Sequence, residues 1–159
     1  MVTTQKNNLR LKGVYLLQIE LSEEDLEVGS LGSISFEGHY IYVGSALGGG
    51  GLARVKRHLE VNRGIKSGGH WHVDSLLEKG ELKRIWVLPT ENDLECKLAR
   101  ALRRRLGDGV EGFGSSDCDC PSHLFPFEEE EDGKLLSAMR KVRGEGDGAP
   151  FSFDPDWFF

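Results

Sequence analysis

The stretch that decides the fold is residues 39–60, HYIYVGSALGGGGLARVKRHLE. Its first part alternates as a strand does and places three residues on one face: Tyr40, Tyr42 and Gly44. Four consecutive glycines follow, and the last part repeats apolar residues at helical spacing: Leu52, Val55 and Leu59. The stretch therefore predicts a strand, a flexible glycine turn and a helix over about residues 51–63.

The neighbouring segments predict a small α+β fold. Residues 13–21 carry apolar side chains on both faces, as expected of a buried strand. Apolar periodicity predicts three further elements: a strand over residues 82–88 and helices over about 70–79 and about 92–106. Residues 22–38 form a polar connection that could include a short strand. We therefore expect a small mixed three-stranded sheet flanked by helices.

Composition divides the chain into three parts. Its 159 residues are 38% hydrophobic, which suffices for one domain with a core. The net charge of −6 is uneven, because residues 128–159 hold nine acidic and four basic residues, whereas residues 1–127 hold 17 and 16. We expect an extension over residues 1–10, a domain over 11–127, and an acidic tail over 128–159 with a glycine-rich linker and an aromatic end.

The chain has no apolar run of membrane-spanning length and no apolar signal-peptide core near its start. Three cysteines are too few for a disulfide framework, which favours a reducing compartment. We therefore expect a cytoplasmic protein with no membrane contact.

The helix that follows the glycines combines a core stripe with basic residues. Arg54 and His58 are four residues apart and lie on one face beside the stripe. Lys56 and Arg57 point further outward, where a solvated basic face is the simplest interpretation for Lys56. The glycines do not form a phosphate-binding P-loop, because Leu52 and Ala53 follow them instead of Lys and Ser or Thr.

The helix over residues 92–106 contains an acidic residue in an apolar position. Its apolar stripe consists of Leu94, Leu98, Ala101, Leu102 and Leu106. Projection at about 100° per residue places Glu95 inside this stripe. A carboxylate that faces a core is costly unless it is paired or binds a cation. Glu95 is therefore either an ion-pair partner or a ligand to a divalent metal ion.

Histidines and cysteines raise two further possibilities. His70 and His72 are two residues apart and do not share a helix face, so they do not favour joint metal binding. Cys118, Cys120 and His123 could bind zinc, with Cys96 as a distant fourth ligand. Their spacing does not match a common zinc-binding pattern, and the sequence favours a tight loop instead of Zn²⁺.

The motifs, taken in order, resemble the GIY-YIG nuclease superfamily. The resemblance rests on Gly13-Val14-Tyr15, Tyr42-Val43-Gly44, the Arg54/His58 pair, a later histidine, and Glu95. The chain is most similar to an uncharacterised, conserved, Uri-type branch whose members are sometimes fused to an endonuclease III. Segments shared with that branch are YVGSA, RHL, HWH and GFGSSDC-C-SHLF. The similarity covers about residues 11–127, and the ordered set is more specific than any one motif.

The resemblance implies a metal-dependent endonuclease that hydrolyses DNA phosphodiester bonds, in DNA repair or in the processing of branched DNA. It implies that Glu95 binds one Mg²⁺ or Mn²⁺ ion, that Tyr15 or Tyr42 helps to deprotonate water, and that Arg54 stabilises the phosphate. It assigns water positioning or the leaving group to His58 and to His70 or His72. It also places a set of residues near the substrate: Gly44, Ser45, Lys56, Arg57, Ser116, Asp117 and His123.

Two features leave alternatives open. The superfamily usually has an asparagine late in the domain, and here Ser116, Asp117 or His123 would have to replace it. A catalytically inactive nucleic-acid-binding module is therefore the alternative function. The aromatic end of the tail, FDPDWFF, either packs back onto the domain or docks on a protein partner such as a sliding clamp.

Overall fold

Two long paired strands form the centre of the protein, seen in a computed structural model that describes residues 10–69, 71–115 and 118–158. They are β1 (Gly13–Glu27) and β2 (Ser33–Ala46), joined by the short 3-10 helix η2 (Gly29–Leu31). The remaining strands are β3 (Glu81–Pro89), β4 (Leu124–Phe127) and β5 (Phe151–Phe153). The helices are α2 (Ala53–Asn62), α3 (His72–Lys79), α4 (Glu95–Leu106) and α5 (Asp132–Val142), with short 3-10 turns η3 (Glu129–Glu131) and η4 (Pro155–Phe158).

The α+β class is confirmed, but the expected mixed three-stranded sheet is wrong. The described residues form one five-stranded sheet in the order β4-β2-β1-β3-β5, and every pairing in it is antiparallel. The two additional strands are edge strands of four and three residues. Such short strands show no alternating pattern that a sequence could reveal, and Pro126 in β4 is tolerated because that strand lies at an edge.

The polar connection over residues 22–38 is mostly strand. Beyond a register shift between Leu21 and Glu24, β1 and β2 continue as a two-stranded ribbon that ends at η2. Most side chains of this ribbon are exposed or half-buried, so polar residues occupy both of its faces. This explains why the sequence lacked the alternation that marks a half-buried strand.

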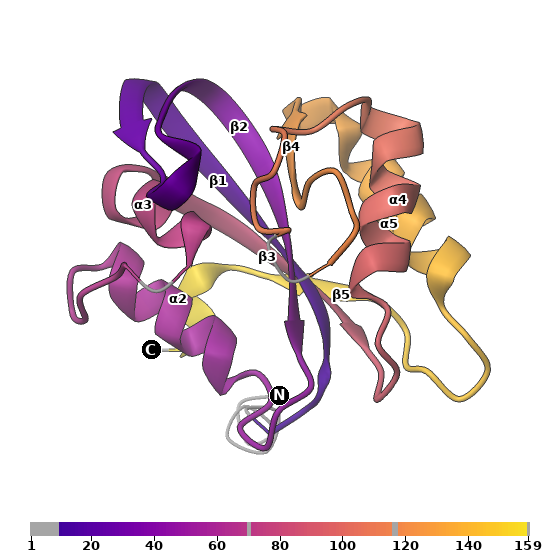
Figure 1. Ribbon diagram of the computed structural model, residues 1–159. Helices are drawn as coiled ribbons and strands as arrows, with labels where there is room; N and C mark the ends of the chain where they lie inside the picture. The colour runs from indigo at the N-terminus through magenta and orange to yellow at the C-terminus, as the bar shows by residue number, and fades with distance from the viewer. Residues whose placement is uncertain (1–9, 70, 116–117, 159) are drawn as a thin grey trace.

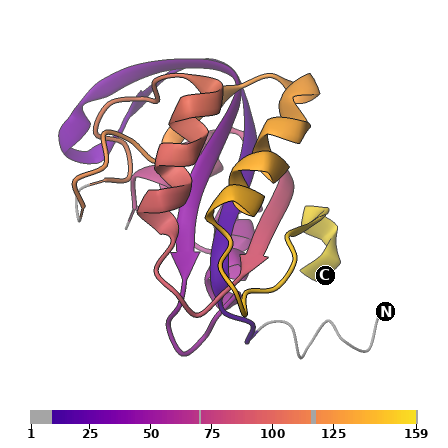
Figure 2. The ribbon, with the colours of Figure 1, turned by 90° about the vertical axis from the view of Figure 1, so that its right-hand side faces the viewer.

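The sheet lies between two pairs of helices and has a core on each face (Figure 1). Helices α2 and α3 cover the face that includes Tyr15, Leu17 and Ile19. Helices α4 and α5 lie side by side over the other face, which includes Val14 and Leu16 (Figure 2). The prediction that residues 13–21 form a strand buried on both faces is therefore confirmed. Among the described residues, no helix combines the length and apolar character needed to cross a bilayer.

One glycine of the run before α2 has a structural role. Gly51 adopts a positive φ of 54°, and a Cβ there would lie 2.6 Å from the Leu11 carbonyl oxygen. The next residue, Leu52, donates its backbone N–H to that same oxygen at 3.0 Å. The turn therefore holds the start of α2 against the start of β1, and only a glycine fits at this point.

The acidic tail is integrated into the fold. Helix α5 packs on α4, and β5 pairs with β3 through Phe151 to Phe153. Phe153 is buried and lies 4.9 Å, between ring centroids, from Trp157. The aromatic residues Phe151, Phe153 and Trp157 thus pack back onto the core, as one of the two sequence interpretations expected. Docking on a sliding clamp stays a prediction that would require these residues to leave the core.

We expect the substitution Phe153→Ala to lower the free energy of unfolding by about 3 kcal/mol, because it removes a buried ring from the core. Chemical denaturation measures this change. Ile65, which is 59% exposed, provides the control, since Ile65→Ala should change stability by less than about 0.5 kcal/mol. Equal effects of the two substitutions would show that the tail does not belong to the core.

Candidate active site

A polar pocket of about 210 Å³ lies where the edge strand β4 stops. The last β4 pairing joins Tyr42 to Leu124, and the Val43 N–H donates to the His123 carbonyl at 2.8 Å. Beyond this point the end of β2, the start of α4 and the loop before β4 all contribute residues to the pocket. The pocket is lined by Tyr15, Tyr42, Gly44, Ser45, Arg54, His58, Trp71, Asp93, Glu95, Cys96, Gly114, Cys118 and His123. The structure therefore brings together eight of the residues predicted from the sequence.

Tyr15 and His58 form a buried hydrogen-bonded pair at the base of the pocket. Tyr15 Oη lies 2.7 Å from His58 Nε2, and the tautomer of the imidazole decides which group donates. His58 is 1% exposed, and its Nδ1 has no hydrogen-bond partner among the described residues. Burial lowers the pKa of His58 to about 3, which Asp74 partly opposes. His58 is therefore neutral at physiological pH.

Gly44 makes room for Tyr15. The two residues are directly opposite each other in the β1–β2 register. A Cβ at position 44 would lie 2.7 Å from Tyr15 Cε1 and closer still to Cζ and Oη. Only a residue without a side chain lets the phenol cross the strand and reach His58. Packing against Tyr15 thus explains why the third residue of the Tyr42-Val43-Gly44 motif is a glycine.

Charged groups of opposite sign act on the two phenols. Burial raises the pKa of Tyr15 and of Tyr42 well above the ordinary value. The Glu95 carboxylate raises both pKa values further, whereas the Arg54 guanidinium lowers them. Both phenols are therefore protonated at neutral pH.

Arg54 and Trp71 form one wall of the pocket. Arg54 donates from Nη1 to the Ser45 carbonyl at 2.9 Å, which fixes its guanidinium near the end of β2. Its Cζ lies 5.2 Å from the centre of the Trp71 ring, and Arg57 Cζ lies 4.5 Å from the same ring. These distances match cation–π contacts. Arg57 also pairs with the buried Asp74 at 3.4 Å, so it supports the wall.

Trp71 is a pocket residue that the sequence reasoning did not select. It is 38% exposed and directly precedes α3, and its ring packs against that of His58 with centroids 5.7 Å apart. The signal available in the sequence was its position between two histidines in His-Trp-His. A large exposed aromatic beside basic residues is typical of a nucleic-acid stacking surface.

Glu95 is the first residue of α4 and its side chain is 27% exposed. The sequence placed it in the apolar stripe, but the helix begins at residue 95, and its first turn lines the pocket. Its Oε2 lies 3.7 Å from His123 Nδ1. A half-buried carboxylate that opens into a polar pocket suits a hard divalent cation such as Mg²⁺, which keeps several coordination positions for water and phosphate. The residues present therefore fit such an ion.

The other predicted site residues are placed elsewhere or lie outside the described part. His72 accepts a hydrogen bond at Nδ1 from the Gly114 N–H at 2.9 Å and packs against Phe113, so it holds the loop that follows α4. Lys56 is half-buried on α2. His70, Ser116 and Asp117 lie outside the described residues.

The loop before β4 brings Cys118 and His123 to the rim of the pocket, where they lie beside Cys96 of α4. His123 is 1% exposed, and burial lowers its pKa. The thiols of Cys96 and Cys118 lie 4.0 Å and 3.4 Å from His123 Nε2. Burial raises the pKa of Cys96, and its hydrogen bonds with Cys120 and Cys118 act in the same direction.

The fold and the pocket define an α+β protein in which a half-buried carboxylate lies beside two phenols, an imidazole and a guanidinium. The chain belongs to the family described as domain of unknown function DUF123, whose family model matches residues 14–144. This match is consistent with the resemblance to the GIY-YIG superfamily. No curated protein and no solved structure matches the chain.

We expect Gly44→Ala to displace the Tyr15 ring and to lower the free energy of unfolding by about 2 kcal/mol, because a methyl group there overlaps the phenol. Chemical denaturation measures the loss. Gly48→Ala is the matched control, since a Cβ at position 48 meets no described atom within 4 Å. If the two variants are equally stable, Tyr15 does not cross the strand at Gly44.

The buried imidazole of His58 predicts a pH dependence of stability. The unfolded chain binds a proton at this residue near pH 6.5, whereas the folded protein does so only near pH 3. Stability from a neutral His58 is therefore complete above about pH 6.5 and is lost as the pH falls toward 3. Between pH 7 and pH 5 the wild type should lose about 2 kcal/mol more than His58→Gln. Urea denaturation at several pH values tests this, and parallel acid profiles would contradict it.

Proposed function

We propose that the pocket is the active site of a metal-dependent endonuclease that hydrolyses DNA phosphodiester bonds. The observation that carries the proposal is the convergence of Tyr15, His58, Arg54 and Glu95 from three separate elements, β1, α2 and α4, into one pocket. Phosphodiester hydrolysis needs charge neutralisation and correct positioning more than covalent help. The pocket offers a carboxylate, a cation and a hydrogen-bonded proton-transfer pair within one small volume.

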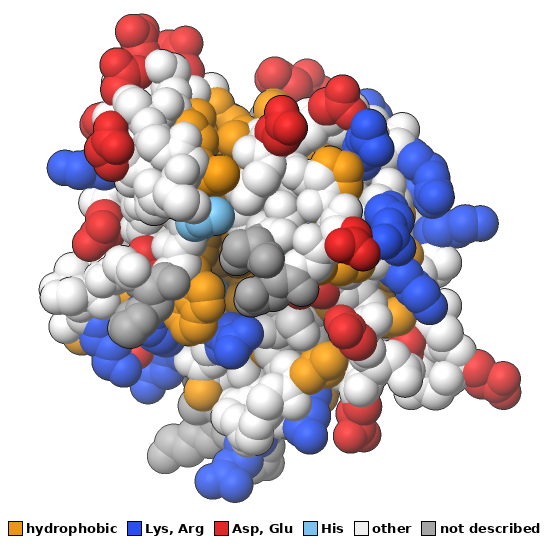
Figure 3. Space-filling view, viewed as in Figure 1, with side chains coloured by type: hydrophobic (Ala, Val, Ile, Leu, Met, Phe, Trp, Pro, Cys, Tyr) orange, Lys and Arg blue, Asp and Glu red, His pale blue; other side chains and the backbone are white. Residues whose placement is uncertain are grey.

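Arg54 and Trp71 are the groups best suited to hold the DNA. Arg54 is exposed, and its contact with the Ser45 carbonyl orients the guanidinium toward the pocket. A guanidinium held in this way can bind a phosphate through two hydrogen bonds. Trp71 offers an exposed ring on which a base can stack. Lys and Arg side chains also gather over α4 and beside α2 (Figure 3), as sequence-independent binding of a phosphate backbone requires.

The Tyr15–His58 pair is the proposed route for the proton of the attacking water. Tyr15 Oη would accept a proton from water while its own proton passes to His58 Nε2 along the existing 2.7 Å hydrogen bond. A neutral imidazole can accept this proton. Burial lowers the pKa of His58 to about 3, so the imidazolium would depend on the negative charge of Asp74, which opposes this shift. The pair thereby avoids a free phenolate, which the high pKa of Tyr15 disfavours.

Glu95 is the proposed ligand for Mg²⁺ or Mn²⁺. A bound divalent cation would supply charge neutralisation at the phosphate and would make a bound water more acidic. Glu95 contributes the negative charge that attracts such an ion, and its 3.7 Å separation from His123 Nδ1 keeps the carboxylate near the rim. In the DNA-free protein this same charge raises the pKa of both phenols.

A nucleic-acid-binding module without catalysis is the second candidate. The observation that favours it is the wall built from Trp71, Arg54 and Arg57, which could hold a backbone phosphate and a base with no chemistry. Such a module would bind DNA with an affinity that falls steeply with salt concentration and would cleave none of the substrates offered.

We expect purified protein with Mn²⁺ to nick DNA and the variant Glu95→Gln to lose more than about 100-fold in rate, exceeding the effect typical of an outer-shell change. The assay should offer flaps, forks, junctions and damaged duplexes in parallel. Glu91→Gln is the matched control, because Glu91 is an exposed carboxylate just before α4.

Two results would contradict the proposal. Equal cleavage by wild type and Glu95→Gln would indicate a contaminating nuclease. Salt-sensitive DNA binding with no cleavage across all substrates and with both Mg²⁺ and Mn²⁺ would establish the binding module instead.

A further inference from the structure

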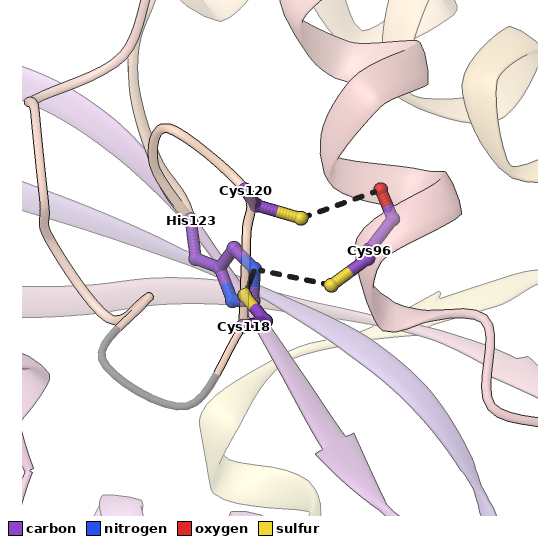
Figure 4. Close-up of side chains that lie close together, drawn as sticks. All are labelled: Cys96, Cys118, Cys120 and His123. Atoms are coloured by element: carbon purple, nitrogen blue, oxygen red, sulfur yellow. Dashed lines mark hydrogen bonds between the residues drawn. The ribbon is translucent and has the colours of Figure 1, made fainter.

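The three cysteines of the chain and one histidine come together in space although the sequence separates them. Cys96 lies in the first turn of α4, whereas Cys118, Cys120 and His123 belong to the loop that leads into β4. Their four side chains point toward one another (Figure 4). One ligand atom from each residue lies within 4.8 Å of all the others. This is a set of three thiols and one imidazole gathered around a common point.

The separations match those around one tetrahedral zinc ion. With Zn–S near 2.3 Å and Zn–N near 2.0 Å, tetrahedral geometry places neighbouring ligand atoms about 3.5 to 3.8 Å apart. Cys118 Sγ is 3.4 Å and Cys96 Sγ is 4.0 Å from His123 Nε2. Only small side-chain adjustments would therefore close the four atoms around an ion.

We propose that Cys96, Cys118, Cys120 and His123 bind one Zn²⁺ in a closed structural site. Four protein ligands leave no open coordination position, which distinguishes a structural zinc site from a catalytic one. Three thiolates select a soft or borderline metal, whereas Mg²⁺ and Mn²⁺ prefer oxygen ligands. The site thus differs in chemistry and in role from the carboxylate site proposed at Glu95.

A zinc ion would also support the loop that carries three of the ligands. This loop runs from the end of α4 at Leu106 to the start of β4 at Leu124 and contains no helix or strand in its described residues. Loops longer than about 12–15 residues without such elements are uncommon in compact domains. Backbone hydrogen bonds join the two sides of this loop, from the Gly112 N–H to the Pro121 carbonyl and from the His123 N–H to the Phe113 carbonyl, each at 2.8 Å. A zinc ion would fasten its far part to α4.

His123 also has the second contact expected of a zinc-binding histidine. Binding through Nε2 leaves a proton on Nδ1, and such a proton is usually donated to a carboxylate, a carbonyl or water. Nδ1 of His123 is buried without a hydrogen-bond partner among the described residues, and it faces Glu95 Oε2 at 3.7 Å. A zinc ion would fix the tautomer that directs this N–H toward Glu95. The zinc site would therefore orient the carboxylate at the pocket rim.

Metal analysis of the full-length protein, purified under reducing conditions without added chelator, tests the inference directly. We expect one zinc per chain. Replacement of zinc by Co²⁺ should give a thiolate-to-cobalt charge-transfer band and the strong visible absorption typical of tetrahedral coordination. Neither measurement depends on DNA cleavage, so failure of the nuclease proposal would leave this result unchanged.

Variants identify the ligands. Cys118→Ser and Cys120→Ser should each abolish stoichiometric zinc binding and the cobalt charge-transfer band. His39→Gln is the matched control, since His39 lies on β2 and pairs with Glu20 and Glu129, and it should retain one zinc. If a cysteine variant does not fold, the reactivity of the wild-type thiols toward a modifying reagent is measured instead. Zinc should then protect all three thiols, and a chelator should expose them.

Three outcomes would overturn the inference. The first is a folded wild-type protein that holds no zinc after incubation with the ion while its three thiols are reduced. The second is a cobalt spectrum without a thiolate charge-transfer band. The third is iron–sulfur absorption in place of zinc.

Discussion

The hydrogen bond between Tyr15 and His58 is the interaction on which the arrangement of the pocket depends. It forms because the register of β1 and β2 sets Tyr15 opposite Gly44, the one position at which a phenol can cross the neighbouring strand. It also needs α2 to present His58 toward the sheet, which the Gly51 turn ensures by holding the helix start against Leu11. Gly44 in β2 and Gly51 in the turn before α2 thus together fix the position of the Tyr15–His58 hydrogen bond.

Electrostatics then divide the pocket into a neutral base and a charged rim. The buried groups Tyr15, Tyr42 and His58 are uncharged at neutral pH because burial disfavours their ionised forms. The charges lie at half-buried or exposed positions, in Glu95 and Arg54, where water and ligands can reach them. This separation suits a site that binds a cation and a phosphate at its opening and keeps the proton-transfer groups buried below them.

Much of this organisation was visible in the sequence. Local periodicity located β1, β3, the second half of β2 and the helices α2, α3 and α4, because each has a face buried in one of two cores. The short edge strands β4 and β5 and the polar ribbon beyond Leu21 could not be predicted, since their side chains show no alternation. The resemblance to the GIY-YIG superfamily predicted most of the pocket residues. Only the folded chain explains why residue 44 is a glycine: the Tyr15 ring of the opposite strand occupies the space of a side chain there.

The cysteine cluster shows the limit of spacing arguments most clearly. Cys118 and Cys120 are too close in sequence for a common zinc pattern, and Cys96 is on a different element, so the sequence favoured a tight loop. The fold brings the start of α4 against that loop and places four ligand atoms within 4.8 Å. Trp71 was missed for a similar reason, because its two arginine neighbours come from one face of α2 rather than from adjacent residues.

The most direct test of the central claim is an anomalous difference map from crystals of the full-length protein grown with Mn²⁺. We predict a manganese peak within about 2.2 Å of a Glu95 carboxylate oxygen, inside the pocket lined by Tyr15, Tyr42 and Arg54. Manganese bound only at other carboxylates, with none at Glu95 under saturating metal, would contradict it.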